Sequence, residues 1–162
     1  STGLLPTWLL LDSCSSIDIV SNPELLTNIR PSHNTITVHC NAGTVKLNQQ
    51  GDLGGYPHPV WYHPNGIANI LSLHRVAQYY RLTMDTNHEL SIILHGHHGN
   101  SIKFSPTGKG LYYYDLTSSH HSIRARLPPN SQRPEIRLFS PRPQDGRWGA
   151  SAPTHYDAPI QP

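Results

Sequence analysis

The sequence predicts a mostly β protein, built as one folded domain followed by a tail. The chain has 162 residues, a length that favours a single domain. Its 15 Pro and 12 Gly favour many turns and few long helices. Its apolar residues fall mainly into short runs bounded by turn residues, which is the pattern of strands in a sheet. A hydrophobic fraction of 36% is enough for one modest core.

The first predicted element is a strand over residues 8–11 that is buried on both faces. This segment is a short continuous apolar run, and it stops at a polar turn that begins with Asp12. A second short strand is expected over residues 17–20. A short helical turn then follows, with Asn22 as its cap and Pro23 at its first helical position.

A hairpin is predicted next. Residues 35–39 and 44–47 alternate apolar and polar side chains on either side of a turn at residues 41–43. Residues 51–59 are rich in Gly and Pro and predict a loop. Residues 60–62 predict another strand.

The second half of the chain predicts one helix, a run of strands and a tail. Residues 67–80 carry apolar side chains at helical spacing and predict the helix. Alternating segments separated by turns predict antiparallel strands over residues 81–85, 91–94, 101–104 and 111–114. Residues 118–162 hold eight of the 15 Pro and six of the nine Arg without any apolar period, so they predict a disordered tail or linker.

The charge balance does not favour a nucleic-acid binder. The formal net charge is +2 with His counted as neutral, and the 12 His would raise it below about pH 6.5. The Arg residues of the tail are dispersed among Pro and acidic residues, so we interpret the tail as a solvated linker, with contact to nucleic acid as the alternative. The two cysteines, Cys14 and Cys40, do not make a disulfide framework and fit a reducing, intracellular setting.

We expect a soluble chain with no membrane segment. Residues 4–11 lack the basic start of a signal peptide, and no run approaches the ~18 apolar residues that span a bilayer. Because the sequence begins at Ser1 rather than at Met, we interpret it as a piece of a longer polypeptide.

Four segments, in order, resemble the protease region of Ty1/copia-type retrotransposon polyproteins. They are Trp8-Leu9-Leu10-Leu11-Asp12-Ser13-Cys14-Ser15-Ser16, Val38-His39-Cys40-Asn41-Ala42-Gly43, Asn69-Ile70-Leu71-Ser72-Leu73 and Gly110-Leu111-Tyr112-Tyr113-Tyr114-Asp115. The last of them resembles the family's junction with its pre-integrase region. The resemblance runs over residues 7–115, roughly two thirds of the chain.

This resemblance implies a retropepsin-like fold over residues 7–115. That fold is a closed β-barrel with one helix, here followed by extra antiparallel strands and by residues 116–162 as the Pro- and Arg-rich tail. The implied activity is that of an aspartic endopeptidase that processes its own polyprotein as a homodimer, with one catalytic Asp per chain. No cofactor, metal or membrane is implied, and the implied location is intracellular and cytoplasmic, or a virus-like particle.

The resemblance also implies roles for individual residues. Asp12 corresponds to the catalytic aspartate, and Ser13 to the residue that braces the loop through hydrogen bonds across the dimer. The hairpin corresponds to the flap over the substrate, with its tip at His39, Cys40, Asn41, Ala42 and Gly43. The packing segment behind the catalytic loop corresponds to Ile70, Leu71 and Ser72.

One residue departs from the family pattern, which has Gly at the position of Cys14. Glycine allows a tight turn and lets its amide approach the carboxylate, so we expect the Cβ and sulfur of Cys14 to crowd the turn. Two hypotheses follow. The domain is an active aspartic endopeptidase, or it is a decayed, structural retropepsin-like module. A nucleic-acid-associated polyprotein segment is the third and weaker alternative.

Other candidate sites have simpler explanations. His95, His97 and His98 lie in a predicted turn with Gly, and we interpret them as a solvated loop rather than a zinc site, which needs converging ligands. Cys14 has no His fixed beside it by the sequence, so we do not assign it as a nucleophile. Residues 112–114 fit a half-buried strand better than a stacking platform for bases. Three carboxylates are interpreted as solvated or structural: Asp18, Asp52 and Asp85.

Overall fold

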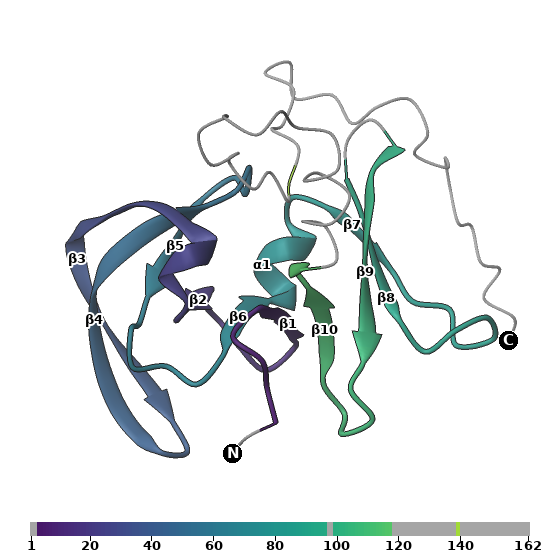
Figure 1. The fold of residues 1–162 in the computed structure, drawn as a ribbon, viewed down its shortest axis with the longest axis horizontal. Coiled ribbons are helices and arrows are strands. Elements are labelled where there is room, and N and C mark those ends of the chain that lie inside the picture. Colours follow the sequence, from purple (N-terminus) through teal and green to yellow (C-terminus); the bar gives the residue numbers. More distant parts are fainter. Residues whose placement is uncertain (1–2, 97–98, 118–138, 140–162) are drawn as a thin grey trace, which may run out of the picture.

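Ten strands form one mixed sheet, and the protein is mostly β (Figure 1). The computed structural model describes residues 3–96, 99–117 and 139. The strands are β1 (Trp8–Asp12), β2 (Ile19–Val20), β3 (Leu26–Cys40), β4 (Gly43–Leu53), β5 (Pro59–Tyr62), β6 (Asn69–Ser72), β7 (Arg81–Thr83), β8 (Ile92–His95), β9 (Ser101–Pro106) and β10 (Tyr112–Asp115). Their order in the sheet is β3-β4-β5-β2-β6-β1-β10-β9-β8-β7. The helical segments are the 3₁₀ helix η1 (Pro23–Leu25) and the α-helix α1 (Leu73–Ala77).

The expectation of a closed barrel is wrong, because the sheet is open. The reason lies at β1, which uses both of its hydrogen-bonding edges. It pairs in parallel with β6 on one side and antiparallel with β10 on the other. The sheet therefore continues from β10 through β9 and β8 to β7, away from β3. Figure 1 shows the β3–β4 hairpin and the β7–β9 strands on opposite sides of α1.

The central strand β1 confirms the prediction of burial on both faces. Leu9, Leu10 and Leu11 are each exposed by 5% or less. Alternate side chains of a strand point to opposite faces, so three consecutive buried leucines require cover on both sides of the sheet. At the start of the strand, the ring of Trp8 stacks on Tyr113 of β10 with a centroid separation of 4.0 Å.

The predicted hairpin is confirmed and is longer than expected. β3 and β4 pair antiparallel up to Cys40 and Gly43, which enclose a two-residue turn. The pairing of β3 with β4 is irregular near Asn28. This residue has a φ of 51°, a positive value that is uncommon outside glycine and that fits a bulge in the strand. The start of the predicted 51–59 loop is instead the end of β4, because these residues pair with β5 on one edge and with β3 on the other.

The helix predicted over residues 67–80 is largely wrong. Residues 69–72 form β6, which lies between β1 and β2, and α1 covers only Leu73–Ala77. A short apolar run fits a strand or a helix by pattern alone, and here pairing with two neighbouring strands decides the matter. Ser72 ends the strand and caps the helix, since its side chain accepts a hydrogen bond from the Arg75 amide.

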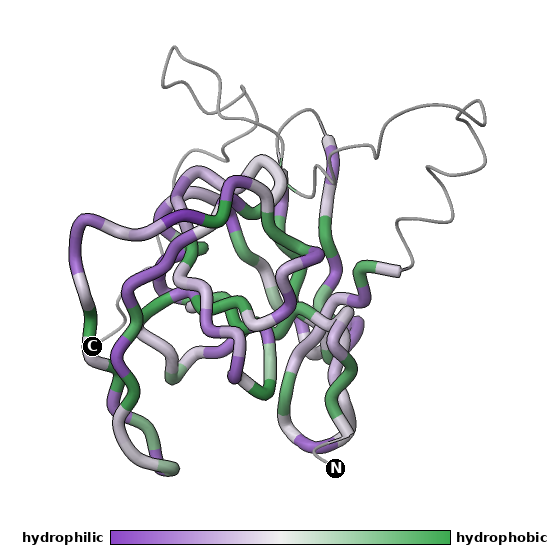
Figure 2. Tube along the Cα trace, turned by 60° about the vertical axis from the view of Figure 1, so that its left-hand side comes forward, coloured by the Kyte–Doolittle hydropathy of each residue, from purple (hydrophilic) through white to green (hydrophobic). Residues whose placement is uncertain are grey.

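The remaining predicted elements are confirmed where the structure describes them. The strands near residues 17–20 and 60–62 and the four strands of the second half are all present, and Asn22 caps η1 with Pro23 at its start. Hydrophobic stretches are concentrated in the middle of the trace (Figure 2). Of the predicted tail, residues 118–138 and 140–162 lie outside the described residues. Phe139 is described, and it is 2% exposed within the core.

Candidate functional site

Asp12 is the last residue of β1 and begins a hydrogen-bonded turn. The next two residues, Ser13 and Cys14, lie outside the sheet and are exposed. The backbone amide of Cys14 donates a hydrogen bond to Oδ1 of Asp12 at 2.8 Å. The carboxylate is half-buried, so it is held by the backbone while remaining in contact with solvent.

Cys14 does not crowd this turn. Asn28 is the only non-glycine residue with a positive φ among the described residues. The φ of Cys14 is therefore not positive, and its backbone conformation is one that any residue can adopt. Its thiol is free and exposed, and its amide still reaches the carboxylate. The expected conflict between the Cβ and the turn is therefore not seen within the single chain.

Strand β6 brings the second predicted segment beside Asp12. In the parallel β1–β6 ladder, Leu11 is paired with Leu71 and Asp12 with Ser72. Leu71 and Ser72 are fully buried, while Ile70 is half-buried. The hydroxyl of Ser72 donates to the carbonyl oxygen of Ser15 at 2.6 Å, which ties the loop to the strand behind it.

A cluster of charged and polar side chains around Asp18 contacts the strand that holds this loop. Sequence reasoning did not find this cluster. Asp18, interpreted above as a solvated carboxylate, is only 2% exposed. Its carboxylate accepts from the Ser72 amide at 2.8 Å, from Nε of Arg75 at 3.0 Å and from the hydroxyl of Tyr56 at 3.1 Å. Burial, followed by the charge and the hydrogen bond of Asp18, raises the pKa of Tyr56. The clue in the sequence is that Asp18 stands between Ile17 and Ile19, where a buried charge needs partners.

The other two carboxylates lie nearer to their expected settings. Asp52 is in β4 rather than in a turn, and it forms an ion pair with Arg30 at 3.0 Å in which both side chains are more than a third exposed. Asp85 is exposed in a turn, where it accepts from the Asn87 amide at 3.0 Å.

Asn69 is a second residue that sequence reasoning passed over. Its side chain is completely buried at the start of β6. The amide oxygen accepts from the backbone amides of Ser21 and Asn22, and the amide nitrogen donates to the carbonyl oxygens of Pro6 and Trp8. The side chain of Asn69 thus connects the residues at the start of β1 with the residues that follow β2. The clue is an amide directly before a buried apolar pair, where its hydrogen-bonding groups need partners.

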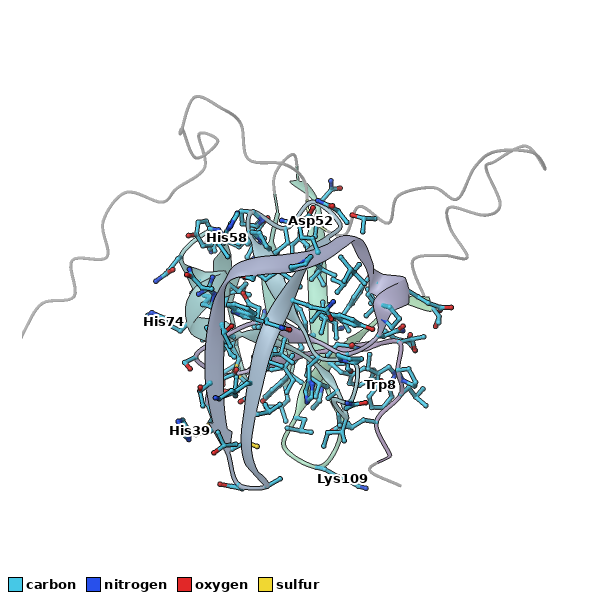
Figure 3. The ribbon with its side chains drawn as sticks, turned by 90° about the vertical axis from the view of Figure 1, so that its left-hand side faces the viewer. Trp8, His39, Asp52, His58, His74 and Lys109 are labelled. Carbon is cyan, nitrogen blue, oxygen red and sulfur yellow. The ribbon has the colours of Figure 1, made fainter. Side chains whose placement is uncertain are left out.

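The hairpin assigned as a flap lies at the edge of the sheet. Strands β5, β2 and β6 stand between it and β1. The contacts of its tip are local, with the Cys40 thiol donating to Gly43 and the Thr44 hydroxyl bonded to His39 Nδ1. Figure 3 shows His39 at the opposite end of the hairpin from Asp52. Asn41, Ala42 and Gly43 are exposed.

We expect His58 to make the stability of the protein depend on pH. Its pKa is lowered from the usual 6.5, chiefly by burial and next by the positive charge of Arg75, while Asp18 acts in the opposite direction. Because the unfolded chain then takes up the proton before the folded chain, the free energy of unfolding falls as the pH drops below 6.5. We expect His58→Phe to reduce this fall. Chemical denaturation of the parent protein and of His58→Phe between about pH 8 and pH 5 measures how the free energy of unfolding changes with pH. The same change in both proteins contradicts the expectation.

Metal and membrane signals are weak in the described part of the chain. It contains no group of three or more His, Cys, Asp or Glu side chains placed to hold a metal ion. His97 and His98 of the candidate cluster lie outside the described residues. No described helix combines the length and the apolar character needed to cross a bilayer.

Comparisons of the chain with protein-family models, with curated proteins and with solved structures found no match.

Proposed function

We propose that this chain is the aspartic endopeptidase domain of a Ty1/copia-type retrotransposon polyprotein. The observation that carries the proposal is the pairing of Asp12 with Ser72 in a parallel ladder, together with the amide of Cys14 on the Asp12 carboxylate. A carboxylate at a strand end, braced by a backbone amide and backed by a buried apolar strand, is held in place for acid–base chemistry.

The chemistry requires two copies of the chain. Each copy contributes one Asp12, and two such carboxylates about 3 Å apart share one proton because like charges at that distance do not both ionise. The ionised carboxylate then takes a proton from the attacking water, and the protonated one polarises the scissile carbonyl. The pair titrates as a unit. A C2 homodimer supplies this arrangement, and the exposed Ser13, whose hydroxyl contacts the Cys14 thiol within the chain, is the residue proposed to bond across it.

The substrate of the proposed enzyme is an extended polypeptide, and its own polyprotein is the first choice. The test is cleavage of a linked polyprotein substrate by the purified dimer at pH 4–6, with inhibition by a statine-type compound. Absence of cleavage by a confirmed dimer contradicts the proposal.

A decayed, structural module is the second candidate, and the exposed thiol of Cys14 favours it. The thiol does not disturb its own turn, but it is exposed on the loop that holds Asp12, which a partner copy and a substrate must approach in the proposed enzyme. If it blocks that space, the fold persists while the activity is lost.

Exchanging Cys14 for Gly separates the two candidates. We expect Cys14→Gly to raise the cleavage rate by at least about tenfold if the side chain obstructs the site, a gain equal to about 1.4 kcal/mol of barrier. The measurement is the rate of substrate cleavage, with Cys14→Ala, which removes the thiol and keeps the Cβ, as the comparison. If both variants behave like the parent, the thiol is not the obstruction.

A further inference from the structure

Phe139 is bound by the folded sheet through its side chain and its backbone. Its ring lies 5.0 Å from the ring of Tyr56 and 5.5 Å from the ring of Tyr80, measured between centroids. Its amide donates to the carbonyl oxygen of Gly54 at 2.9 Å. Phe139 is 2% exposed, although it follows the last strand of the described residues by more than twenty positions. We call the site formed by Gly54, Gly55, Tyr56 and Tyr80 the Phe139 pocket.

The walls of the Phe139 pocket also make contacts that do not involve Phe139. The Tyr56 hydroxyl is held by Asp18, which fixes the ring that forms one wall. Tyr80 is 3% exposed, and burial raises its pKa to about 12. Gly55, which directly precedes Tyr56, has a φ of +78°, and a Cβ at this position would collide with the carbonyl group of Phe139. The absence of a side chain at Gly55 therefore lets the Phe139 backbone approach closely.

A side-chain pocket next to a paired backbone amide is how folded domains recognise extended peptides. We propose that the Phe139 pocket is a docking site for an extended peptide with a phenylalanine, occupied here by Phe139 of the chain itself. Docking holds Phe139 to the folded sheet, at a point beyond the bond between the Leu116 amide and the carbonyl oxygen of Thr7.

The docking site does not include Asp12, although its Tyr56 shares the Asp18 carboxylate with Ser72, the residue paired with Asp12. His58, close to Tyr56 in space, lies at the opposite end of the molecule from His39 at the hairpin tip (Figure 3). The inference therefore does not depend on Asp12 being catalytic, and it is tested by binding rather than by cleavage.

The chain contains only two phenylalanines, which makes a direct test possible. In the full chain labelled with fluorinated phenylalanine, the ¹⁹F spectrum has one signal from Phe104, which is fully buried in β9, and one from Phe139. We expect both signals to resist broadening by a soluble paramagnetic compound. A Phe139 signal that broadens as in an unfolded chain contradicts the docking.

A peptide with the sequence of residues 134–144 tests the specificity of the pocket. We expect it to bind the full-length Phe139→Ala protein at least about tenfold more tightly than the parent, because the docked segment competes at a millimolar effective concentration. A peptide with Ala in place of Phe139 serves as the control and should bind neither protein. Equal binding of the first peptide to both proteins, or binding to neither, overturns the proposal. If Phe139→Ala does not fold, displacement of the ¹⁹F signal of Phe139 in the parent by millimolar peptide decides the question, with Phe104 as the internal reference.

Discussion

Replacement of Asp12 by asparagine is expected to lower the rate of peptide cleavage by about 10²–10⁴-fold, the usual contribution of a positioned acid–base group. Asparagine keeps an oxygen that can accept from the Cys14 amide, so the turn should persist. It has no carboxyl proton to exchange, so the shared-proton pair of the proposed dimer cannot form. The measurement is the cleavage rate of the dimer, accompanied by the melting temperature.

Asp85→Asn is the matched control for this change. Asp85 accepts from the amide of Asn87 two positions later, as Asp12 accepts from the amide of Cys14, but it is exposed in a turn after β7. The same chemical substitution there should leave cleavage unchanged. A cleavage rate that survives Asp12→Asn, or falls equally in both variants, would remove Asp12 from the mechanism.

The second large effect is on stability, at Asp18. We expect Asp18→Ala to lower the free energy of unfolding by about 3–5 kcal/mol, because it leaves the buried Ser72 amide and Tyr56 hydroxyl without an acceptor and the Arg75 charge without its partner. The Ser72 amide, the Arg75 guanidinium and the Tyr56 hydroxyl would all lose the acceptor that they share. Denaturant unfolding measures the change.

Asp52→Ala provides the comparison. Asp52 and Asp18 each pair with an arginine at 3.0 Å, but the Asp52 side chain is 46% exposed and that of Asp18 is 1% exposed. An exposed pair contributes about 0–1 kcal/mol, so Asp52→Ala should change the stability far less. Similar losses in the two variants would show that burial does not set the value of the Asp18 cluster.

The sequence predicted the local elements of the fold better than their assembly. The strand at β1 and the hairpin turn at Asn41 follow from patterns of neighbouring residues, and both are present. The open sheet could not be predicted, because it depends on β10 pairing with an edge of β1, a contact between distant segments that no local pattern records. For the same reason the segment before α1 was interpreted as helix, although its partners in the sheet make it a strand.

The residues of the candidate site also differ in how far the sequence could predict them. Asp12 and its turn were found from a contiguous motif, while Asp18 and Asn69 were missed, because their roles depend on partners that fold in from elsewhere. Polar residues within apolar surroundings were the available signal. Such residues require hydrogen-bond partners if they are buried, but the sequence does not say which residues supply them.

The parallel pairing of β1 with β6 also determines when the Asp12 loop can form during synthesis. The bond from Ser72 to Ser15 joins residues 57 positions apart in the chain, and the whole β3–β4 hairpin lies between them. Long-range pairing of this kind closes a large loop and is slow to form. A ribosome-bound chain would therefore carry an unfinished Asp12 loop until β6 and α1 had emerged. In the proposed polyprotein this order would delay the proposed proteolytic activity until the domain is complete.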